Sequence, residues 1–275
     1  MIVDLHIHST ASDGQYAPAE VVRLAKAAGV EIVALTDHDT VAGVSEALAQ
    51  GRELGMTVLT GVEFSAAEYH NLHILGYGMD LQNTALLDLC AAMKRSREDH
   101  NTYIVDFLHR HGVPIDLEEV KELAGNASIG RPHFAQIMLR HGWVKNSREA
   151  FDRYLDTPEY HQVDRKKFSA RECVAAILSA GGKPVLAHPY QLQLEDKALE
   201  GEVKRLLSYG LLGIECYYPR HTPEKQAFYL RLAEKYHLYV TAGSDFHGEK
   251  VHPEDKFRPV ELDVEWLLPE KRDRV

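Results

Sequence analysis

Strand patterns and helix patterns alternate at short spacing through the first 80 residues of the chain, and this alternation most constrains the fold. Pro18 begins a helical segment that Gly29 ends, and Gly55 ends a second one, in keeping with the positional preferences of these residues. Short apolar segments that alternate with helices predict parallel β/α units. The predicted strands span residues 2–8, 31–36, 57–62 and 72–77, and the helices span 18–28 and 41–54.

A helical region interrupts this alternation from residue 85 to 156, where Ile104, Phe107 and Leu108 follow helical spacing. The alternation then resumes, with helices at 170–180, 197–209 and 223–236 and strands at 183–187, 212–216 and 239–242. We therefore expect an α/β barrel domain formed by residues 1–84 and 165–275, with a helical insertion, or cap domain, at residues 85–164.

Residue types that bind metals lie at or just beyond the C-terminal end of almost every predicted strand. Asp4, His6 and His8 alternate along the first strand, so we expect them to share one face. Alone, they would also fit the solvent-facing side of an edge strand. The others are Asp13, His38, Glu63, His73, His188, Asp245 and His247, and the strand at 212–216 offers Glu215. In β/α barrels this end carries the active site, so the set predicts a metal centre.

The types of ligand in this set restrict the metal. Imidazoles mixed with carboxylates favour zinc, manganese or iron over magnesium or calcium, which prefer oxygen ligands. Nine candidate ligands are too many for one tetrahedral zinc ion. We therefore expect two or three divalent ions, with Glu63 as the best candidate for a bridging carboxylate because few acids stand at a central strand end.

Composition excludes several other classes of protein. The formal net charge of −10 argues against a stable complex with nucleic acid, although it is compatible with a small phosphorylated substrate. No apolar run reaches the roughly 18 residues that a membrane span needs, and the N-terminus lacks the pattern of a signal peptide. Three widely spaced cysteines make a disulfide framework unlikely to form, so we expect a cytoplasmic protein.

The ligand pattern resembles that of the PHP (polymerase and histidinol phosphatase) family. The resemblance rests on His6-x-His8, Asp13, Thr36-Asp37-His38, Gly61-Val62-Glu63, His73, His188-Pro189 and Asp245-Phe246-His247. It implies a distorted (β/α)7 barrel with three ions, usually manganese, iron or zinc. It also implies three ligand sets, namely His6, His8, Glu63 and Asp245; Glu63, His73 and His188; and Asp13, His38 and His247.

Two further motifs resemble those of stand-alone PHP phosphoesterases that act on nucleotides, including 3',5'-nucleoside bisphosphates, 5'-mononucleotides and short RNA 5' ends. They are Ser128-Ile129-Gly130-Arg131-Pro132-His133 and Tyr217-Tyr218-Pro219-Arg220-His221. The resemblance implies a metal-dependent phosphoesterase, a 3',5'-nucleoside bisphosphate 3'-phosphatase that also degrades short RNA from its 5' end. We expect hydroxide shared by two ions to attack phosphorus directly, because such ions lower the pKa of a water molecule toward about 7.

Arginine and histidine in these motifs are the candidates for substrate binding and proton transfer. Arg131 and Arg220 would bind phosphate, since a guanidinium matches a phosphate group in shape and charge; surface arginines paired with acids are the alternative. His133 and His221 would protonate the leaving oxygen, although His133 also fits a helix surface. Either Asp37 or Asp39 would orient His38, or Asp39 would cap the next helix.

Two other functions are compatible with the same sequence. The first is a phosphatase for another small phosphomonoester, such as histidinol phosphate. The second is a metal-binding module without catalytic activity, such as a proofreading-support domain of a polymerase, although the chain is too short to include a polymerase. The favoured partner is a small phosphorylated nucleotide or a short RNA 5' end.

Overall fold

The computed structural model describes residues 1–125, 129–162 and 166–268, and the chain forms two compact units. The first unit comprises residues 1–91 and 168–275, and the second comprises residues 92–167. Ser128 and the expected domain boundary at 164/165 lie outside the described residues. Within the described ranges, no helix has the length and apolar character needed to cross a membrane.

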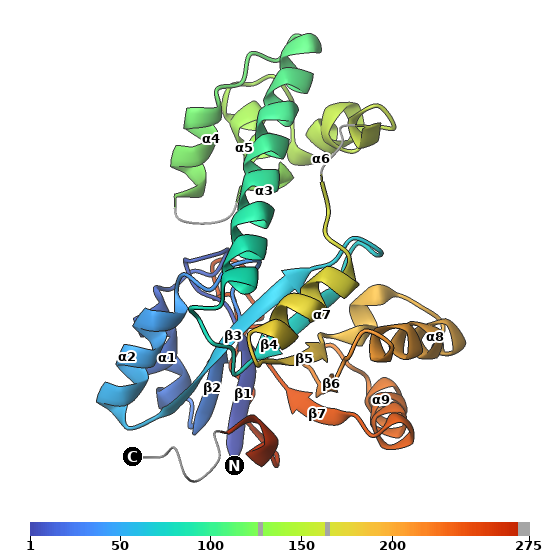
Figure 1. Ribbon diagram of the computed structural model, residues 1–275. Helices are drawn as coiled ribbons and strands as arrows, with labels where there is room; N and C mark the ends of the chain where they lie inside the picture. Colours follow the sequence, from blue (N-terminus) through green and yellow to red (C-terminus); the bar gives the residue numbers. More distant parts are fainter. Residues whose placement is uncertain (126–128, 163–165, 269–275) are drawn as a thin grey trace. The chain divides into compact units, whose positions relative to one another are not determined.

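The first unit is built on an eight-stranded sheet that curls into a nearly closed barrel (Figure 1). Its order is β7-β6-β5-β4-β3-β2-β1-β8. The residues after β7 return to β1, where the amide of His8 donates to Phe246 O (2.9 Å) and the amide of Asp245 donates to His6 O (2.8 Å). The strands are β1 (Ile2–Ile7), β2 (Ile32–Leu35), β3 (Thr57–Ser65), β4 (His73–Tyr77), β5 (Lys183–Leu186), β6 (Gly213–Tyr217), β7 (Tyr239–Ala242) and β8 (Val260–Glu261).

Helices cover the outside of this sheet (Figure 1). They begin and end where local chemistry permits: Pro18 occupies the first turn of α1, and Gly55 ends α2 in the left-handed conformation, with φ of 60°. Val21 and Val22 of α1 pack against Leu35 of β2. The helices are α1 (Pro18–Ala27), α2 (Val44–Leu54), α7 (Ala170–Ser179), α8 (Asp196–Leu207) and α9 (Pro223–Tyr236), with short turns η3 (Pro189–Leu192) and η4 (Glu265–Leu267). The predicted α/β class and distorted (β/α)7 barrel are confirmed.

The direction of β4 corrects the prediction of parallel β/α units. β4 runs antiparallel to both β3 and β5. The link from β3 to β4, residues 66–72, contains no helix, and a parallel crossover needs a dozen or more residues. As a result, the start of β4 lies beside the end of β3, where His73 pairs with Ser65.

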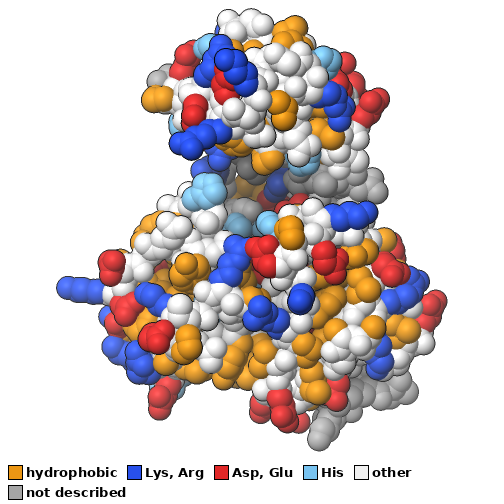
Figure 2. Space-filling model, turned by 180° about the vertical axis from the view of Figure 1, so that it is seen from behind, with side chains coloured by type: hydrophobic (Ala, Val, Ile, Leu, Met, Phe, Trp, Pro, Cys, Tyr) orange, Lys and Arg blue, Asp and Glu red, His pale blue; other side chains and the backbone are white. Residues whose placement is uncertain are grey.

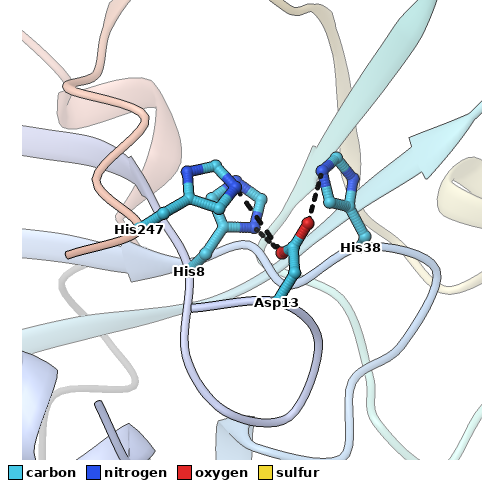
Figure 3. Close-up of side chains that lie close together, drawn as sticks. All are labelled: His8, Asp13, His38 and His247. Carbon is cyan, nitrogen blue, oxygen red and sulfur yellow. Dashed lines mark ion pairs between the residues drawn. The ribbon is translucent and has the colours of Figure 1, made fainter. Parts of the chain in front are cut away.

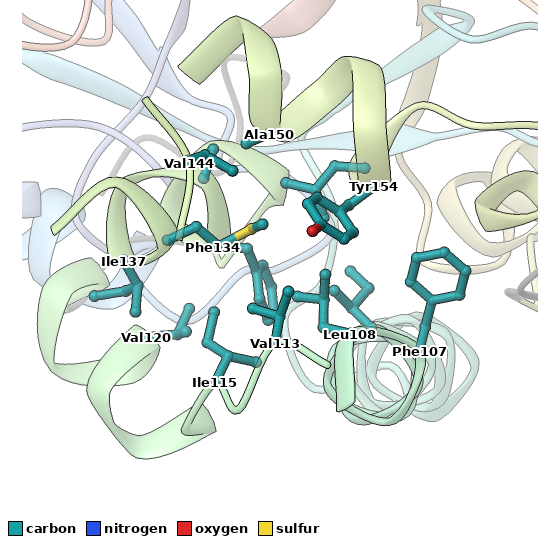
Figure 4. Packing of buried hydrophobic residues seen from close by; sticks show 14 of the residues in the cluster. Phe107, Leu108, Val113, Ile115, Val120, Phe134, Ile137, Val144, Ala150 and Tyr154 are labelled. Carbon is teal, nitrogen blue, oxygen red and sulfur yellow. The ribbon is translucent and has the colours of Figure 1, made fainter. Parts of the chain in front are cut away.

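The second unit has a hydrophobic core of its own (Figure 4). Phe107 and Leu108 of α3 pack with Phe134 and Ile137 of α5 and with Tyr154. The elements here are α3 (Thr84–Arg110), α4 (Leu117–Ala124), α5 (Arg131–Arg140), α6 (Ser147–Ala150), the π-helical turn η1 (Phe151–Leu155) and η2 (Tyr160–Gln162). The unit begins at Ala92, within α3, whereas the expected insertion begins at residue 85.

Candidate metal centre

Six histidines and three acids from separate strand ends converge in the barrel unit. Asp13 lies in the loop after β1, Glu63 lies within β3, and Asp245 follows β7. His73 joins them because β4 is antiparallel, which brings its first residue to this end of the barrel. The full set, which is the predicted one, is His6, His8, Asp13, His38, Glu63, His73, His188, Asp245 and His247.

The first group has the spacing of ligands around one ion. Glu63 Oε2 lies 3.3 Å from the Nε2 atoms of both His6 and His8. Asp245 Oδ1 lies 3.4 Å from His6 Nε2 and 3.1 Å from His8 Nε2. Two ligands that each lie about 2.1 Å from one ion are about 3.0 to 3.4 Å apart at octahedral or tetrahedral angles. The four atoms therefore fit a divalent ion.

A second group surrounds the other oxygen of Glu63. Glu63 Oε1 lies 2.7 Å from His73 Nδ1 and 2.8 Å from His188 Nε2, and these two nitrogens are 3.3 Å apart. The oxygen that faces His6 and His8, Glu63 Oε2, also has a third histidine beside it, because His38 Nδ1 lies 3.0 Å away. Within the described part of the chain, Glu63 is thus the one carboxylate in contact with both groups, and its two oxygens face different histidines. This is the arrangement expected of a carboxylate that bridges two ions.

The third group is centred on Asp13 (Figure 3). Asp13 Oδ1 lies 3.5 Å from His247 Nε2 and 3.7 Å from His8 Nδ1, and Oδ2 lies 3.7 Å from His38 Nε2. These separations are longer than those in the first two groups. The Asp13 side chain is also 35% exposed, so this group forms the open side of the cluster.

Among the residues that the structure describes, several buried polar atoms of the cluster lie close to one another without forming a hydrogen bond. They include His6 Nε2, both ring nitrogens of His8, His38 Nδ1 and Glu63 Oε2. A buried polar atom without a partner costs about 1–3 kcal/mol, so such a concentration needs a compensating ligand. Divalent cations would satisfy these lone pairs, and the residues present therefore fit a multi-ion centre.

The charges in the cluster also favour bound cations. Burial lowers the pKa of His8, but Asp245 and Glu63 outweigh burial and raise it to about 10. Burial would raise the pKa of Glu63, yet His38 and His73 hold it well below its usual range. The carboxylates therefore remain ionised, and they attract positive charge, from protons or from metal ions.

Glu215 of β6 contacts two of the candidate ligands, His6 and His188, but is not itself one of the nine. Its carboxylate lies 3.2 Å from His6 Nδ1 and accepts a hydrogen bond from the amide of His188 (2.8 Å). A proton on His6 Nδ1 leaves Nε2 free to face the cluster. Asp4 likewise stays outside the cluster, because its Oδ1 accepts from the amide of Ser244 (2.9 Å). The expectation that Asp4 shares the ligand face of His6 and His8 is therefore wrong, and β1 has an irregular register between Asp4 and Ile7.

Close approach and backbone strain mark the strand ends that carry ligands. A Cβ on Gly243 would lie 2.2 Å from His6 Cβ, so only glycine fits where β7 passes His6. His188 and Asp245 have positive φ angles of 21° and 55°, which non-glycine residues rarely adopt. Such strain persists only where surrounding contacts maintain it, and it is common at functional sites.

Asp37 organises the loop that carries Asp13. It is fully buried, and its carboxylate accepts hydrogen bonds from Ser9 N (2.7 Å), Ser9 Oγ (2.7 Å) and Ser12 Oγ (2.6 Å). Asp37 therefore holds the adjacent loop, and the predicted role of orienting His38 is replaced by this one. Asp39 does not cap α2, which begins only after Gly43; its Oδ1 accepts from the amide of Ser65 (2.8 Å).

An Asp37→Ala variant is expected to bind metal about 10- to 100-fold more weakly, because residues that hold a ligand loop affect affinity by this amount. Calorimetric titration with Mn²⁺ measures the loss. Ser9→Ala, which removes one of the three hydrogen bonds to Asp37 and keeps the one from the Ser9 amide, serves as a graded control with a smaller loss. Equal Mn²⁺ affinity in Asp37→Ala and the unmodified protein would show that the loop does not depend on Asp37.

A cavity of about 380 Å³ opens over the cluster of candidate ligands within the barrel unit. Tyr218 lines it, donates to Asp245 Oδ2 (3.0 Å) and accepts from Gln191 Nε2 (2.7 Å). Figure 2 shows histidine side chains at the surface of the barrel unit with lysine and arginine side chains nearby. Lys256 and Arg258 also line the cavity, and sequence reasoning missed both.

The two candidates from the 217–221 motif lie in different surroundings. Arg220 lines the cavity and is half exposed, with Nη2 3.7 Å from Glu254 Oε1. His221 is not among the residues that line the described cavity. Its Nδ1 donates to Cys216 O (2.9 Å), and its ring packs against Tyr218 and Tyr229. Burial lowers the pKa of His221, so the ring is neutral near pH 7.

The candidates from the insertion motif lie in the second unit. Arg131 begins α5, where its Nη1 donates to Leu155 O (3.2 Å) and to Asp156 Oδ1 (2.9 Å). His133 Nδ1 accepts from the amide of Gly130 (3.0 Å), and burial lowers its pKa. These contacts show how each side chain is held within its own unit.

Comparisons with known proteins show which family the chain is similar to. A family model described as the PHP domain matches residues 4–161. A 5'-3' exoribonuclease from Haemophilus influenzae is 34% identical, covering 89% of each chain. A phosphoribosyl 1,2-cyclic phosphate 1,2-diphosphodiesterase from Eggerthella lenta is 35% identical, covering 90% of this chain and 95% of the relative.

A further relative and a solved structure extend the likeness. A 3',5'-nucleoside bisphosphate phosphatase from Chromobacterium violaceum is 32% identical, covering 90% of this chain and 87% of the relative. A crystal structure described as an amidohydrolase from Chromobacterium violaceum with bound sulfate and no metal has a TM-score of 0.79 at 30% identity. It covers 95% of this chain and 92% of that chain.

Proposed function

The chain belongs to the PHP domain family, and from its ligand cluster we propose that this metal-dependent phosphoesterase removes phosphate from phosphorylated nucleotides. The observation that carries the proposal is the convergence of nine ligand-type side chains, with unsatisfied buried atoms, beneath a cavity that Arg220, Lys256 and Arg258 help to line. We propose a 3',5'-nucleoside bisphosphate as the substrate, cleaved at the 3'-phosphate, and short RNA 5' ends as a further one.

The nine side chains would hold two or three divalent ions in the three groups described above, and we propose manganese as the native metal, with iron or zinc as alternatives. Bound ions would supply positive charge to the phosphoryl oxygens and lower the pKa of a water molecule. The residues of the protein itself would position the ligand atoms. Glu63 places one oxygen in each of two groups, Glu215 holds His6, and the Tyr218 hydroxyl fixes Asp245.

The printed names of the three relatives support the substrate class. One names a nucleoside bisphosphate, one a phosphoribosyl cyclic phosphate, and one RNA. All three are ribose derivatives with more than one phosphate group. Arg220 lies at the cavity rim, where its guanidinium would leave Glu254 and bind a phosphate group of such a substrate. We place the reaction in the cytoplasm.

A phosphate-release screen with added manganese tests the proposal. Its arms are adenosine 3',5'-bisphosphate, adenosine monophosphates, a 5'-phosphorylated RNA dinucleotide, histidinol phosphate and a sugar phosphate. We expect the bisphosphate to have the highest kcat/KM. Hydrolysis of histidinol phosphate at an equal or higher kcat/KM would reject the nucleotide assignment, and inactivity on every arm with full metal loading would reject the enzyme.

Arg131 is proposed to bind substrate phosphate, and an Arg131→Ala variant is expected to raise KM about 10- to 100-fold with unchanged metal content, the range for a lost charged hydrogen bond. Asp156→Asn is the matched control, because it removes the ion-pair partner of Arg131 and keeps the guanidinium. If Asp156→Asn raises KM as much as Arg131→Ala does, Arg131 acts through the structure of its own unit and does not bind substrate.

A further inference from the structure

Lys256 and Arg258 are cations without acidic partners at the rim of the metal cavity. Both line the cavity, and both are exposed. Within the described ranges of the chain, neither side chain forms an ion pair or a hydrogen bond. Other cations of the barrel unit are held in ion pairs, as Arg205 is with Glu202 and Glu68.

The acids beside these two cations on the same segment have other partners. Asp255 accepts a hydrogen bond from the amide of the ligand residue His247 (2.9 Å), so its carboxylate holds the metal cluster in place. Glu254 lies 3.7 Å from Arg220. The segment between β7 and β8 therefore offers two cations on the cavity side that form no ion pair with the acids beside them, Glu254 and Asp255, and field lines concentrate in such a cavity.

Packing holds the segment that carries Lys256 and Arg258 in place. Phe257, which lies between them, stacks on Phe246 with a ring separation of 4.2 Å and joins the core formed with α1 and α2. Both neighbours of this aromatic anchor line the cavity, and the amide of Lys250 in the same segment is held by Gln15 Oε1 (2.8 Å).

We propose that Lys256 and Arg258 form an anion subsite that binds the phosphate monoester of the substrate that is not cleaved. This proposal rests on the proposed function and deepens it, because it makes the enzyme selective for nucleotides that have a second phosphate group. The metal cluster lies in the same cavity, so one phosphate occupies the cluster while the other contacts the two cations. Arginine and lysine side chains are the usual partners of phosphate in proteins.

The test compares two substrates with the same scissile bond, adenosine 3',5'-bisphosphate and adenosine 3'-monophosphate. In the Lys256→Ala/Arg258→Ala variant, we expect kcat/KM for the bisphosphate to fall about 10- to 100-fold, since each contact is a charged hydrogen bond. We expect less than about a twofold change for the monophosphate, which cannot fill the subsite. Both side chains are exposed, so the fold should be unaffected, and the Lys256→Arg/Arg258→Lys exchange should restore most of the preference.

Lys250→Ala is the matched control, because it removes one positive charge from the same segment outside the cavity lining. The subsite would be overturned if the double variant lost the same factor in kcat/KM on both substrates, or if Lys250→Ala lost as much as the double variant. A fall in kcat/KM that is confined to a 5'-phosphorylated RNA dinucleotide would also overturn it. Calorimetric binding to the metal-free protein, which we expect not to hydrolyse the substrate, separates this result from failure of the proposed function. If the double variant binds bisphosphate as tightly as its parent does, the subsite is wrong, whatever the enzyme hydrolyses.

Discussion

A Glu63→Gln variant is expected to lose at least about 1,000-fold of its phosphoesterase rate, because a metal centre contributes several kcal/mol to the transition state and each 1.36 kcal/mol is tenfold. The amide keeps the shape of the side chain but has only one acceptor oxygen. Glu63 contacts His6 and His8 through one oxygen and His73 and His188 through the other. Its replacement therefore weakens two ligand groups at once.

Metal content and steady-state rate, measured on the same samples, check this prediction. Glu68→Gln is the control, because it makes the same chemical change in the chain segment next to β3, and Glu68 contacts Ala170 and Arg205 instead of the cluster. Circular dichroism confirms that each variant is folded. A Glu63→Gln protein with full metal content and a rate within tenfold of the original would contradict the bridging role.

Removal of metal by a chelator is expected to abolish activity, and added Mn²⁺ is expected to restore it. The same treatment should lower the thermal stability of the barrel unit, since unpaired atoms of His6, His8, His38 and Glu63 are buried there. A ligand at 100 times its Kd stabilises the folded state by about 2.7 kcal/mol. For a domain of this size that corresponds to a rise in Tm of about 5 °C or more on reloading.

Differential scanning calorimetry before and after reloading with Mn²⁺ gives this shift directly. In the Glu63→Gln variant the shift should be smaller, because fewer ligands remain for the same ions. An unchanged Tm in the original protein, together with full activity in the presence of a chelator, would show that the cluster is not a metal centre.

The barrel could be predicted from the sequence because strand and helix periodicities are local properties of the chain. The direction of β4 could not, because residues 72–77 have the same strand pattern in either direction. Only the short link at 66–72 excludes a crossover helix. His73 shows the consequence: it stands at the start of its strand, yet β4 runs antiparallel, which brings it to the end of the barrel where the other ligand-type residues stand.

The ligand-type residues were predictable for a related reason. Parallel strands end at one rim, so residues that end separate strands must meet there, and the spacing of His38 and Glu63 after their strands carries that information. Lys256 and Arg258 carry no such signal. Their segment has no strand or helix pattern, and its place depends on two tertiary contacts, Asp255 with His247 and Phe257 with Phe246.

Anomalous diffraction from crystals of the manganese-loaded protein tests the central claim most directly. We expect two or three manganese peaks in the cluster, at least one of them within about 2.0 to 2.3 Å of a Glu63 oxygen, His6 Nε2 and His8 Nε2, the range for oxygen and nitrogen ligands of such ions. Strong manganese peaks elsewhere on the chain, with none among these side chains, would contradict the account.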